Sequence, residues 1–321
     1  MPEIWKNDRG YLLLRRYVDP FTRASYSSFK VEGGLPDDGR AVIIAPNHCN
    51  TLMDALVVLR SRPLEATVFG ARADIFRKAG RALRFLKILP LARERDGTGT
   101  IRECLGSFEE VDQTLAAGVP FCLFPEGRHR PGRTLLPIQK GVARMAFRSA
   151  RERPTVVVPA GINYSHFFRY RGSCILRYGA PIDVNAFLET HSGEAEAAQY
   201  QAFREELAQR IQALVDPQPI PFRRRWWVLP LWPLAALLSL PLWATAEWLC
   251  HRKIKDAAFH NTARFGVKLV GTPLFALLWA ILLFCLLPWP WALALLVLYF
   301  FSYSLFYDGL HLFHAKNEGN S

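Results

Sequence analysis

The sequence lacks the paired cysteines that mark a disulfide framework or a structural zinc site. Its six cysteines are scattered along the chain, and none forms a Cys-x-x-Cys pair: Cys49, Cys104, Cys122, Cys174, Cys250 and Cys285. This spacing favours buried or incidental reduced thiols over disulfides or metal ligands. No other cluster of metal-ligating side chains is evident, so we expect neither a metal ion nor a bound cofactor.

A secretory segment is also missing from the start of the sequence. The stretch MPEIWKNDRGYLLLRRYVDP contains only a short apolar run, YLLL, between charged residues. A secretory signal needs a longer apolar core. We therefore expect the N-terminal part of the chain to stay in the cytosol.

Acidic residues are scarce relative to basic ones. The chain has 28 Asp and Glu against 40 Lys and Arg, which gives a formal net charge of +12. Such an excess must face something anionic: nucleic acid, an anionic membrane or a phosphorylated substrate. Residues 226–306 are dominated by Leu, Trp, Phe, Ala and Pro, for which nucleic-acid binding gives no reason. An anionic bilayer accounts for both features, so nucleic acid is not an expected partner.

Residues 29–220 alternate strand-like apolar runs with amphipathic helical segments. AVIIAPN, VPFCLFPEG and PTVVVPAGINY predict buried strands, whereas FRKAGRALRFLKI and EAAQYQAFREELAQRIQALV predict helices. This alternation predicts an α/β sheet covered on both faces. Residues 1–28 form a basic amphipathic segment, whose helix either anchors the chain at a membrane surface or packs on the domain.

Residues 221–321 predict a membrane-associated helical region. The uncharged segment 269–287 has about the length that crosses the hydrocarbon, and 291–306 is apolar again. We therefore expect a transmembrane hairpin over 269–306 that turns at Pro288–Pro290. The segment 226–249 has basic residues on both sides, which by the positive-inside rule both prefer the cytoplasm. It is therefore expected to be re-entrant or interfacial and made of broken helices; the alternative is a full span.

A histidine and an acid flank a predicted strand-to-helix turn in PNHCNTLMD. Residues six apart on one helix lie about 120° apart around its axis, so His48 and Asp54 meet only if His48 sits on the turn. A neutral imidazole is a good general base near pH 7, and an acid on its other nitrogen fixes the tautomer. Asp54 also fits a capping box with Thr51, and both roles can hold.

Four segments together resemble a known enzyme family. PNHCNTLMD, LPLARERDG, LFPEGRHRPGRTLLPIQKG and VVVPAGINY follow the order and approximate spacing of the four motifs of the glycerol-phosphate and lysophosphatidic acid acyltransferases. The resemblance covers roughly residues 30–185 and implies the fold of that family, a mixed α/β sheet flanked by helices, here with a C-terminal helical membrane region. Two departures concern the acceptor more than the reaction: one extra residue between His48 and Asp54, and His129 after Glu-Gly-Arg.

The resemblance assigns roles to individual residues. It implies that His48 is the base and Asp54 its orienter, with no acyl-enzyme, so Cys49 is disfavoured as a nucleophile. Arginine forks suit phosphate oxygens, and His129 either assists them or is a surface histidine. Glu126 is expected to position substrate or Arg128, Gly127 to let backbone approach the substrate, and Pro159 to shape the acyl side or simply end a strand. The implied substrate-binding residues are Asn47, Arg93, Glu126, Gly127, Arg128, Lys140 and Pro159.

The sequence thus predicts a membrane-bound O-acyltransferase of phospholipid biosynthesis. The expected donor is acyl-CoA or acyl-carrier protein, and the expected acceptor is 1-acylglycerol-3-phosphate, which would give phosphatidic acid. Glycerol 3-phosphate or dihydroxyacetone phosphate is the alternative acceptor. A non-catalytic lipid-binding membrane protein is the alternative of another class. We expect a cytoplasmic membrane location with the catalytic domain on the cytoplasmic side, against anionic lipid.

Overall fold

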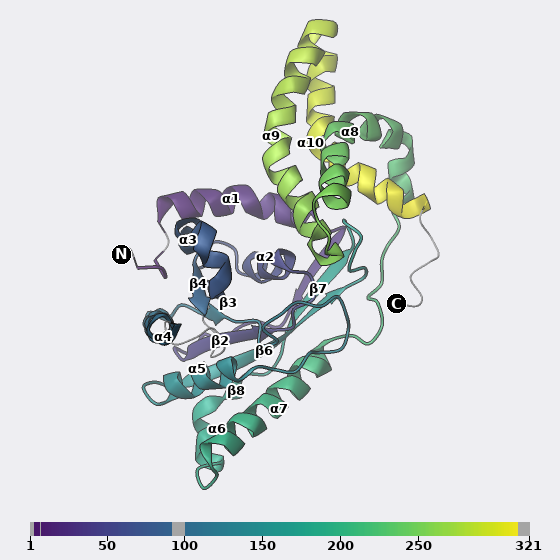
Figure 1. The fold of residues 1–321 in the computed structure, drawn as a ribbon. Coiled ribbons are helices and arrows are strands. Elements are labelled where there is room, and N and C mark those ends of the chain that lie inside the picture. Colours follow the sequence, from purple (N-terminus) through teal and green to yellow (C-terminus); the bar gives the residue numbers. More distant parts are fainter. Residues whose placement is uncertain (1–2, 7, 92–99, 314–321) are drawn as a thin grey trace.

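The computed structural model describes residues 3–6, 8–91 and 100–313 (Figure 1). One sheet forms the centre of the molecule, with helices on both faces and three long helices at the C-terminal end. The strands are β1 (Ser28–Glu32), β2 (Ala41–Pro46), β3 (Val68–Arg72), β4 (Ile88–Leu91), β5 (Phe121–Cys122), β6 (Thr155–Tyr164), β7 (Ser173–Tyr178) and β8 (Ile182–Asp183).

The sheet is mixed, which confirms the predicted fold class. Its strand order is β1-β7-β6-β2-β5-β3-β4, with β8 also paired to β6. Strands β6, β2, β5, β3 and β4 are parallel, whereas β7 and β8 run antiparallel to β6. Every residue of β2 and β6 is buried, as expected of central strands covered on both faces. Their carboxyl ends therefore lie next to each other at one edge of the sheet.

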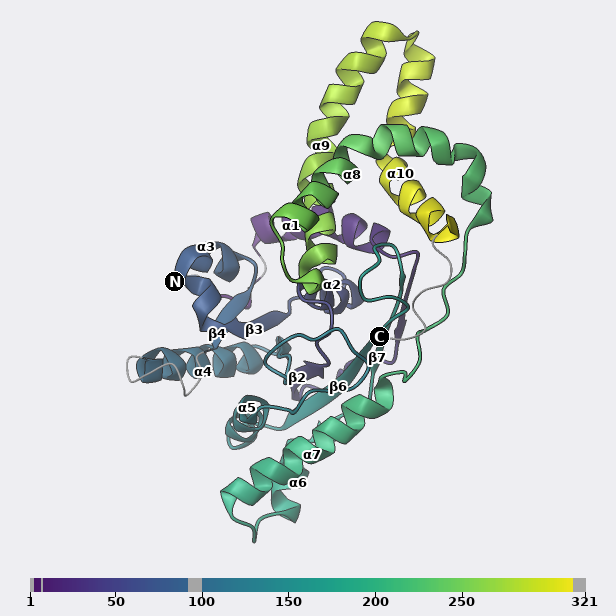
Figure 2. The same ribbon diagram turned by 45° about the vertical axis from the view of Figure 1, so that its right-hand side comes forward.

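Two hydrophobic cores cover the two faces of the sheet. Below it lie α4 (Thr100–Ala116), α5 (Lys140–Ala150), α6 (Val184–Thr190) and α7 (Glu196–Leu214), which pack on inward residues such as Ile43 and Val157. Above it lie α1 (Arg9–Ala24), α2 (Leu52–Ser61) and α3 (Phe76–Phe85) (Figure 2). The upper core includes Ile44, Val158 and Met53. Successive strand residues thus alternate between the cores, as the period of a strand requires.

The first helix packs on the domain, which is one of the two predicted alternatives; the membrane anchor stays a prediction. Arg15 is buried and donates to the carbonyls of Leu59 and Arg62 at the end of α2, which fixes α1 on the domain. Leu13 on the same helix remains 69% exposed. Tyr17 donates to the carbonyl of Leu269 on α9. The helix therefore packs on the domain and still presents apolar surface beside the C-terminal helices.

The C-terminal helices are α8 (Trp232–Arg252), α9 (His260–Leu286) and α10 (Trp289–Phe313), with short 3-10 turns η3 (Trp226–Leu231) and η4 (Ala257–Phe259) before α8 and α9. Helices α9 and α10 form a hairpin that stands away from the sheet, and α8, which contains Pro241, is bent (Figure 2). The hairpin turns between Leu286 and Trp289, close to the predicted Pro288–Pro290.

Among the described residues, three helical stretches are long and apolar enough to cross a membrane: Trp226–Arg252, Ala257–Leu286 and Trp289–Phe313. The re-entrant course of 226–249 and the transmembrane hairpin stay predictions. The upper core also continues into these helices, because Leu242, Phe265 and Tyr303 belong to it together with Met53 and Tyr164. The domain boundary predicted near residue 220 is therefore a change in composition that one continuous core crosses.

Candidate active site

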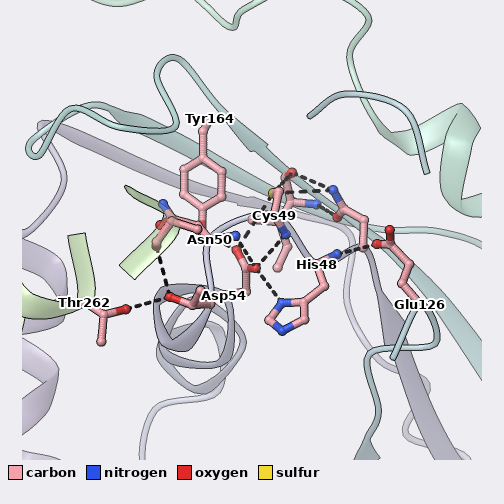
Figure 3. Close-up of polar contacts among 11 residues, drawn as sticks. His48, Cys49, Asn50, Asp54, Glu126, Tyr164 and Thr262 are labelled. Carbon is pink, nitrogen blue, oxygen red and sulfur yellow. Dashed lines mark hydrogen bonds and ion pairs between the residues drawn. The ribbon is translucent and has the colours of Figure 1, made fainter. Parts of the chain in front are cut away.

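The carboxyl ends of β2, β5 and β6 bring the predicted catalytic residues together. His48 follows β2, Glu126 follows β5, and Tyr164 ends β6 (Figure 3). Because β2 is hydrogen-bonded to both other strands in parallel register, the three side chains come from one edge of the sheet. Residues far apart in the sequence thus converge on one point.

His48 and Asp54 form the predicted pair. Nδ1 of His48 lies 2.8 Å from Oδ2 of Asp54, and Asp54 is fully buried. The same Oδ2 accepts the backbone N–H groups of Cys49 and Asn50 at 2.8 and 2.7 Å. The other oxygen accepts the hydroxyl of Tyr164 at 2.8 Å. A carboxylate held by so many donors has a fixed position, and it in turn fixes the imidazole.

The predicted capping box is wrong in detail. Thr51 has a φ of 46°, and its side chain caps no backbone N–H of α2. Its hydroxyl instead lies 2.7 Å from the hydroxyl of Thr262 and donates to the carbonyl of Ala258, both in the C-terminal region. Asp54 reaches back to Cys49 and Asn50 rather than to Thr51. The acid therefore holds the turn that carries His48, which serves the pair rather than the helix end.

Glu126 holds the backbone of His48 in place. One carboxylate oxygen accepts the N–H of His48 at 2.7 Å and the other accepts the N–H of Leu136 at 2.8 Å. The His48 carbonyl accepts the N–H of Arg130. Burial is the main cause that raises the pKa of the Glu126 carboxyl above its usual range. Glu126 thus ties the two loops together, a role distinct from the substrate positioning implied by the resemblance.

Asn47 and Cys49 both contact Ile162 of the neighbouring strand β6. The side-chain amide of Asn47 accepts the N–H of Ile162 at 2.6 Å and donates to the Ile162 carbonyl at 3.2 Å. These two bonds continue the hydrogen bonding between β2 and β6 beyond the end of β2. Cys49 is buried, and burial raises the pKa of its thiol well above the usual range. A thiol in that state is a poor nucleophile, in agreement with the lower rank given to it from the sequence.

The other predicted residues take different places. Gly127 has a φ of +67° and closes a tight turn onto the carbonyl of Phe124, a conformation that favours glycine. Arg128 follows it and is exposed. Lys140 is exposed at the first residue of α5. Pro159 lies two residues after Val157, so its side chain takes the lower face, opposite His48. Arg93 lies outside the described residues.

The imidazole of His48 is packed but open on one side. Phe124 stacks on it, with ring centroids 4.1 Å apart and an angle of 21° between the rings. The side chain is 17% exposed. Because Asp54 accepts at Nδ1, the neutral ring keeps its lone pair on Nε2, the atom that can take a proton from a hydroxyl. The arrangement is that of a general base with an orienting acid.

The structure adds residues that the sequence did not identify. Tyr164 lies within the segment VVVPAGINY, but only the pairing of β6 with β2 brings its hydroxyl to Asp54. The contacts of Thr51 with Ala258 and Thr262 likewise depend on how the C-terminal helices dock. Sequence spacing gives no signal for either, because the partners are more than a hundred residues apart.

Known proteins have sequences similar to part of this chain. Residues 28–163 match the family model described as Acyltransferase. Glycerol-3-phosphate O-acyltransferase 2 of Saccharomyces cerevisiae is 42% identical over 66 residues, which are 20% of this chain and 9% of that protein. Glycerol-3-phosphate O-acyltransferase 1 of the same yeast is 34% identical over 80 residues, which are 24% of this chain and 10% of that protein. The matched segments thus span only about a tenth of these relatives.

A solved structure also resembles the chain. It is the 1-acyl-sn-glycerophosphate acyltransferase PlsC of Thermotoga maritima, with a TM-score of 0.43 and 20% identity, covering 64% of this chain and 82% of that chain. Residues 28–163, with His48, Asp54 and Glu126 among them, therefore form an acyltransferase domain within this chain.

Proposed function

We propose that the protein transfers a fatty acyl group from a thioester, acyl-CoA or acyl-carrier protein, to a hydroxyl of a glycerol-phosphate acceptor. The observation that carries the proposal is the His48–Asp54 pair, with Nδ1 held at 2.8 Å and Nε2 left to act as a base. The acyltransferase match over residues 28–163 includes this pair.

The reaction needs one base that later acts as an acid. Nε2 of His48 takes the proton of the acceptor hydroxyl while the oxygen attacks the thioester carbonyl. Asp54 stabilises the imidazolium that forms. When the tetrahedral intermediate collapses, the C–S bond breaks, His48 returns the proton to the departing thiolate, and an ester and a free thiol result. The buried thiol of Cys49 takes no part.

Cationic side chains near His48 support a phosphorylated acceptor. The loop from Arg128 to Arg133 is fixed to the His48 carbonyl through the Arg130 N–H. Arg133 is half-buried, donates to the carbonyl of Tyr164 at 2.9 Å and stacks over Phe167. Arg128 is exposed on the same loop. Arginines placed beside the base suit the oxygens of a phosphate monoester.

Glycerol 3-phosphate is the acceptor that we propose first. Two relatives that are named glycerol-3-phosphate O-acyltransferases match this chain at 42% and 34% identity over short segments. The acceptor expected from the sequence alone, 1-acylglycerol-3-phosphate, differs by one acyl chain and presents the same phosphate. An assay with both acceptors ranks them.

We also propose that the C-terminal helices hold this site at a membrane surface. Three apolar helical stretches and the net charge of +12 suit an anionic bilayer. The catalytic domain would then face the cytoplasm, because basic residues flank the segment 226–249 on both sides. Labelling of cysteines introduced at 255 and 320 from each side of sealed vesicles tests this topology, and opposite accessibility of the two would contradict it.

The test of the activity uses the full chain in vesicles that contain anionic lipid, with acyl-CoA and each of glycerol 3-phosphate, 1-acylglycerol-3-phosphate and dihydroxyacetone phosphate. We expect release of free thiol together with acylated product, and His48→Ala is expected to lower kcat by roughly 10²–10⁴-fold. His191→Ala, just after α6 at the opposite side of the sheet, is the matched control and should stay within about twofold. Thiol release that is absent with every acceptor, or equal in His48→Ala, would instead favour a lipid-binding protein without catalysis.

A further inference from the structure

Thr51 has a strained backbone at the start of the helix that carries Asp54. Its φ of 46° and ψ of −124° are those of the first central residue of a type II′ turn, a position that glycine normally takes. The N–H of Met53 closes this turn onto the carbonyl of Asn50 at 3.0 Å. A positive φ is an outlier for a β-branched residue, and it persists only where the surrounding structure holds it.

The turn determines how Asp54 meets the groups that it orients. Oδ2 of Asp54 accepts the N–H groups of Cys49 and Asn50 at 2.8 and 2.7 Å. It also lies 2.8 Å from Nδ1 of His48. All three partners precede Thr51 in the chain, whereas Asp54 follows it. A rotation of Thr51 to a negative φ would therefore swing these partners away from the carboxylate.

The C-terminal region holds Thr51 in this conformation. The Thr51 hydroxyl donates to the carbonyl of Ala258 at 3.3 Å and lies 2.7 Å from the hydroxyl of Thr262. Because a threonine hydroxyl has a single proton, Thr51 donates to Ala258 and accepts from Thr262. Thr51 is buried, so these partners are shielded from water. Figure 3 shows Thr262 on the side of Asp54 opposite His48.

The start of α9 is itself fixed to the sheet domain. Nδ2 of Asn261 donates to the carbonyl of Phe167 at 2.7 Å. Nη1 of Arg264 donates to the carbonyl of Phe168 at 2.9 Å. Both carbonyls lie in the loop between β6 and β7, at the edge of the sheet that carries the active site. Thr262 lies between these two residues of α9, so its hydroxyl has a fixed position.

We propose that Thr51 and Thr262 are positioning residues of the catalytic pair. The hydroxyl of Thr262 holds the backbone of Thr51 in a conformation that a threonine rarely adopts, and this conformation holds Asp54 against His48. The role rests on the proposed function, because the pair is the base of that reaction. It makes the C-terminal helices a support of the active site, in addition to the membrane role proposed above.

The substitution Thr262→Val removes the hydroxyl and keeps the shape of the side chain. We expect kcat to fall about tenfold, because the pair loses its fixed geometry, and KM for acyl-CoA and for glycerol 3-phosphate to stay within about twofold. Thr262→Ser keeps the hydroxyl and should recover most of kcat. An unchanged kcat in Thr262→Val overturns the proposal, as does a rise in either KM with kcat unchanged.

The substitution Thr51→Gly separates the strain from the hydroxyl. Glycine adopts a positive φ without steric cost, so the turn no longer needs its support. In this background Thr262→Val should lower kcat by less than about twofold, against about tenfold in the otherwise unaltered chain. Thr51→Val keeps the strain and loses both hydrogen bonds, so its kcat should be lower than that of Thr51→Gly. An equal loss from Thr262→Val in both backgrounds overturns the proposal, because Thr262 would then act on something other than the turn.

Thr245→Val is the matched control in the C-terminal helices. Thr245 is exposed, and its hydroxyl donates to the Pro241 carbonyl within the same helix. Its kcat should stay within about twofold of the unaltered protein. Thermal unfolding in detergent checks that each variant is folded at the assay temperature. A fall in kcat that Thr245→Val shares with Thr262→Val overturns the proposal.

The proton between His48 and Asp54 gives a readout without turnover. In protein with ¹⁵N-labelled histidine, NMR detects this Nδ1–H, and its loss in His48→Ala assigns it. We expect its exchange with solvent to be about fivefold faster or more in Thr262→Val and to slow again in Thr262→Ser. An equal exchange rate in Thr262→Val overturns the positioning role even if the protein transfers acyl groups. The expected acceleration in a protein with no transferase activity would support the positioning role and reject the proposed reaction.

Discussion

The buried acid Asp54 is the most constrained side chain of the catalytic pair. It accepts hydrogen bonds from two backbone N–H groups and one tyrosine hydroxyl in addition to the His48 ring. An asparagine in its place would lack the charge and would turn its NH2 group toward some of these N–H and O–H donors. The fixed acid therefore determines the tautomer of His48.

Asp54→Asn should abolish most of the activity while the fold survives. We expect kcat to fall by roughly 10³–10⁴-fold, because the wrong tautomer of His48 is favoured, and stability to fall by about 1–3 kcal/mol, because a buried donor is left unpaired. Acyl transfer and thermal unfolding, each measured on the purified variant, check the two parts. Activity above a tenth of normal would contradict the assigned role.

Tyr164→Phe removes a single hydroxyl from the same network. The ring fills the same space, and the hydrogen bond to Oδ1 of Asp54 is lost, at a cost of about 1 kcal/mol in stability. We expect kcat to fall by roughly tenfold with KM unchanged, since Asp54 loses one of its fixed donors. A rise in KM without a change in kcat would place Tyr164 at the substrate rather than behind Asp54.

The sequence motifs identified the residues of the pair but not their supports. His48 and Asp54 are six residues apart, so local geometry was enough to place them on one turn. The role of Glu126 as a clamp on the His48 backbone depends on a hydrogen bond across 78 residues. Tyr164 meets Asp54 across 110 residues. Contacts of this kind depend on the order of the strands, which no local pattern contains.

At the scale of the elements, the turn after β5 places Glu126. Gly127 closes this turn with a φ of +67° and donates its N–H to the Phe124 carbonyl. Phe124 stacks on His48 within the same turn. One glycine thus permits the geometry that brings a clamp and a packing ring to the base.

Gly127→Ala should therefore weaken both the fold and the activity. A side chain in the left-handed region costs about 1–2 kcal/mol, which should lower the unfolding midpoint and reduce kcat several-fold as His48 loses its fixed position. Gly106→Ala, in the interior of α4 where a Cβ meets open space, is the matched control. It should stabilise the protein by about 0.5–1 kcal/mol.

The elements themselves were largely predictable from patterns. The buried runs of β2 and β6 and the amphipathic pattern of α3 and α7 appear at the expected positions. The strand of VPFCLFPEG is shorter than expected, since only Phe121–Cys122 are paired before the chain turns. Gly127 closes that turn, since its N–H bonds to the carbonyl of Phe124.

At the scale of the whole molecule, a buried ion pair joins the sheet domain to the C-terminal helices. Nε of Arg171 donates to Oδ1 of Asp308, in α10, at 2.9 Å, and Nη2 donates to Oδ2 at 2.5 Å. The two side chains are 7% and 2% exposed. Arg225 adds a second cation at 3.2 Å. Arg171 also donates to the carbonyls of Ala24 and Tyr26.

Asp308→Asn should weaken the contact between the sheet domain and α10. Removing one partner of a buried pair leaves uncompensated charge and costs about 3–5 kcal/mol, so the unfolding midpoint in detergent should fall clearly. Glu32→Gln, in an exposed pair with Arg177, is the matched control and should change stability by less than about 1 kcal/mol. Equal unfolding midpoints for the two variants would show that the Arg171–Asp308 ion pair contributes little to stability.

Acid should weaken the same region. Burial, together with Arg169 and Arg133, lowers the pKa of His166 to about 4, below about 6.5 for a histidine in an unfolded chain. The unfolded state therefore binds more protons between these two values, and stability falls as the pH drops through that window. His166→Gln should flatten the fall of the unfolding midpoint between pH 7 and pH 5, whereas His251→Gln at an exposed site should not.

The upper core has a consequence for the order in which the protein is made. Met53, beside the active site, and Tyr303, in α10, belong to one core. Tyr303 lies 250 residues after Met53 in the sequence and is therefore synthesised much later. The upper core around Met53 and Tyr164 stays incomplete until α10 has emerged and docked. A nascent chain is therefore expected to remain inert through most of its synthesis and to gain its activity only after α10 has been made.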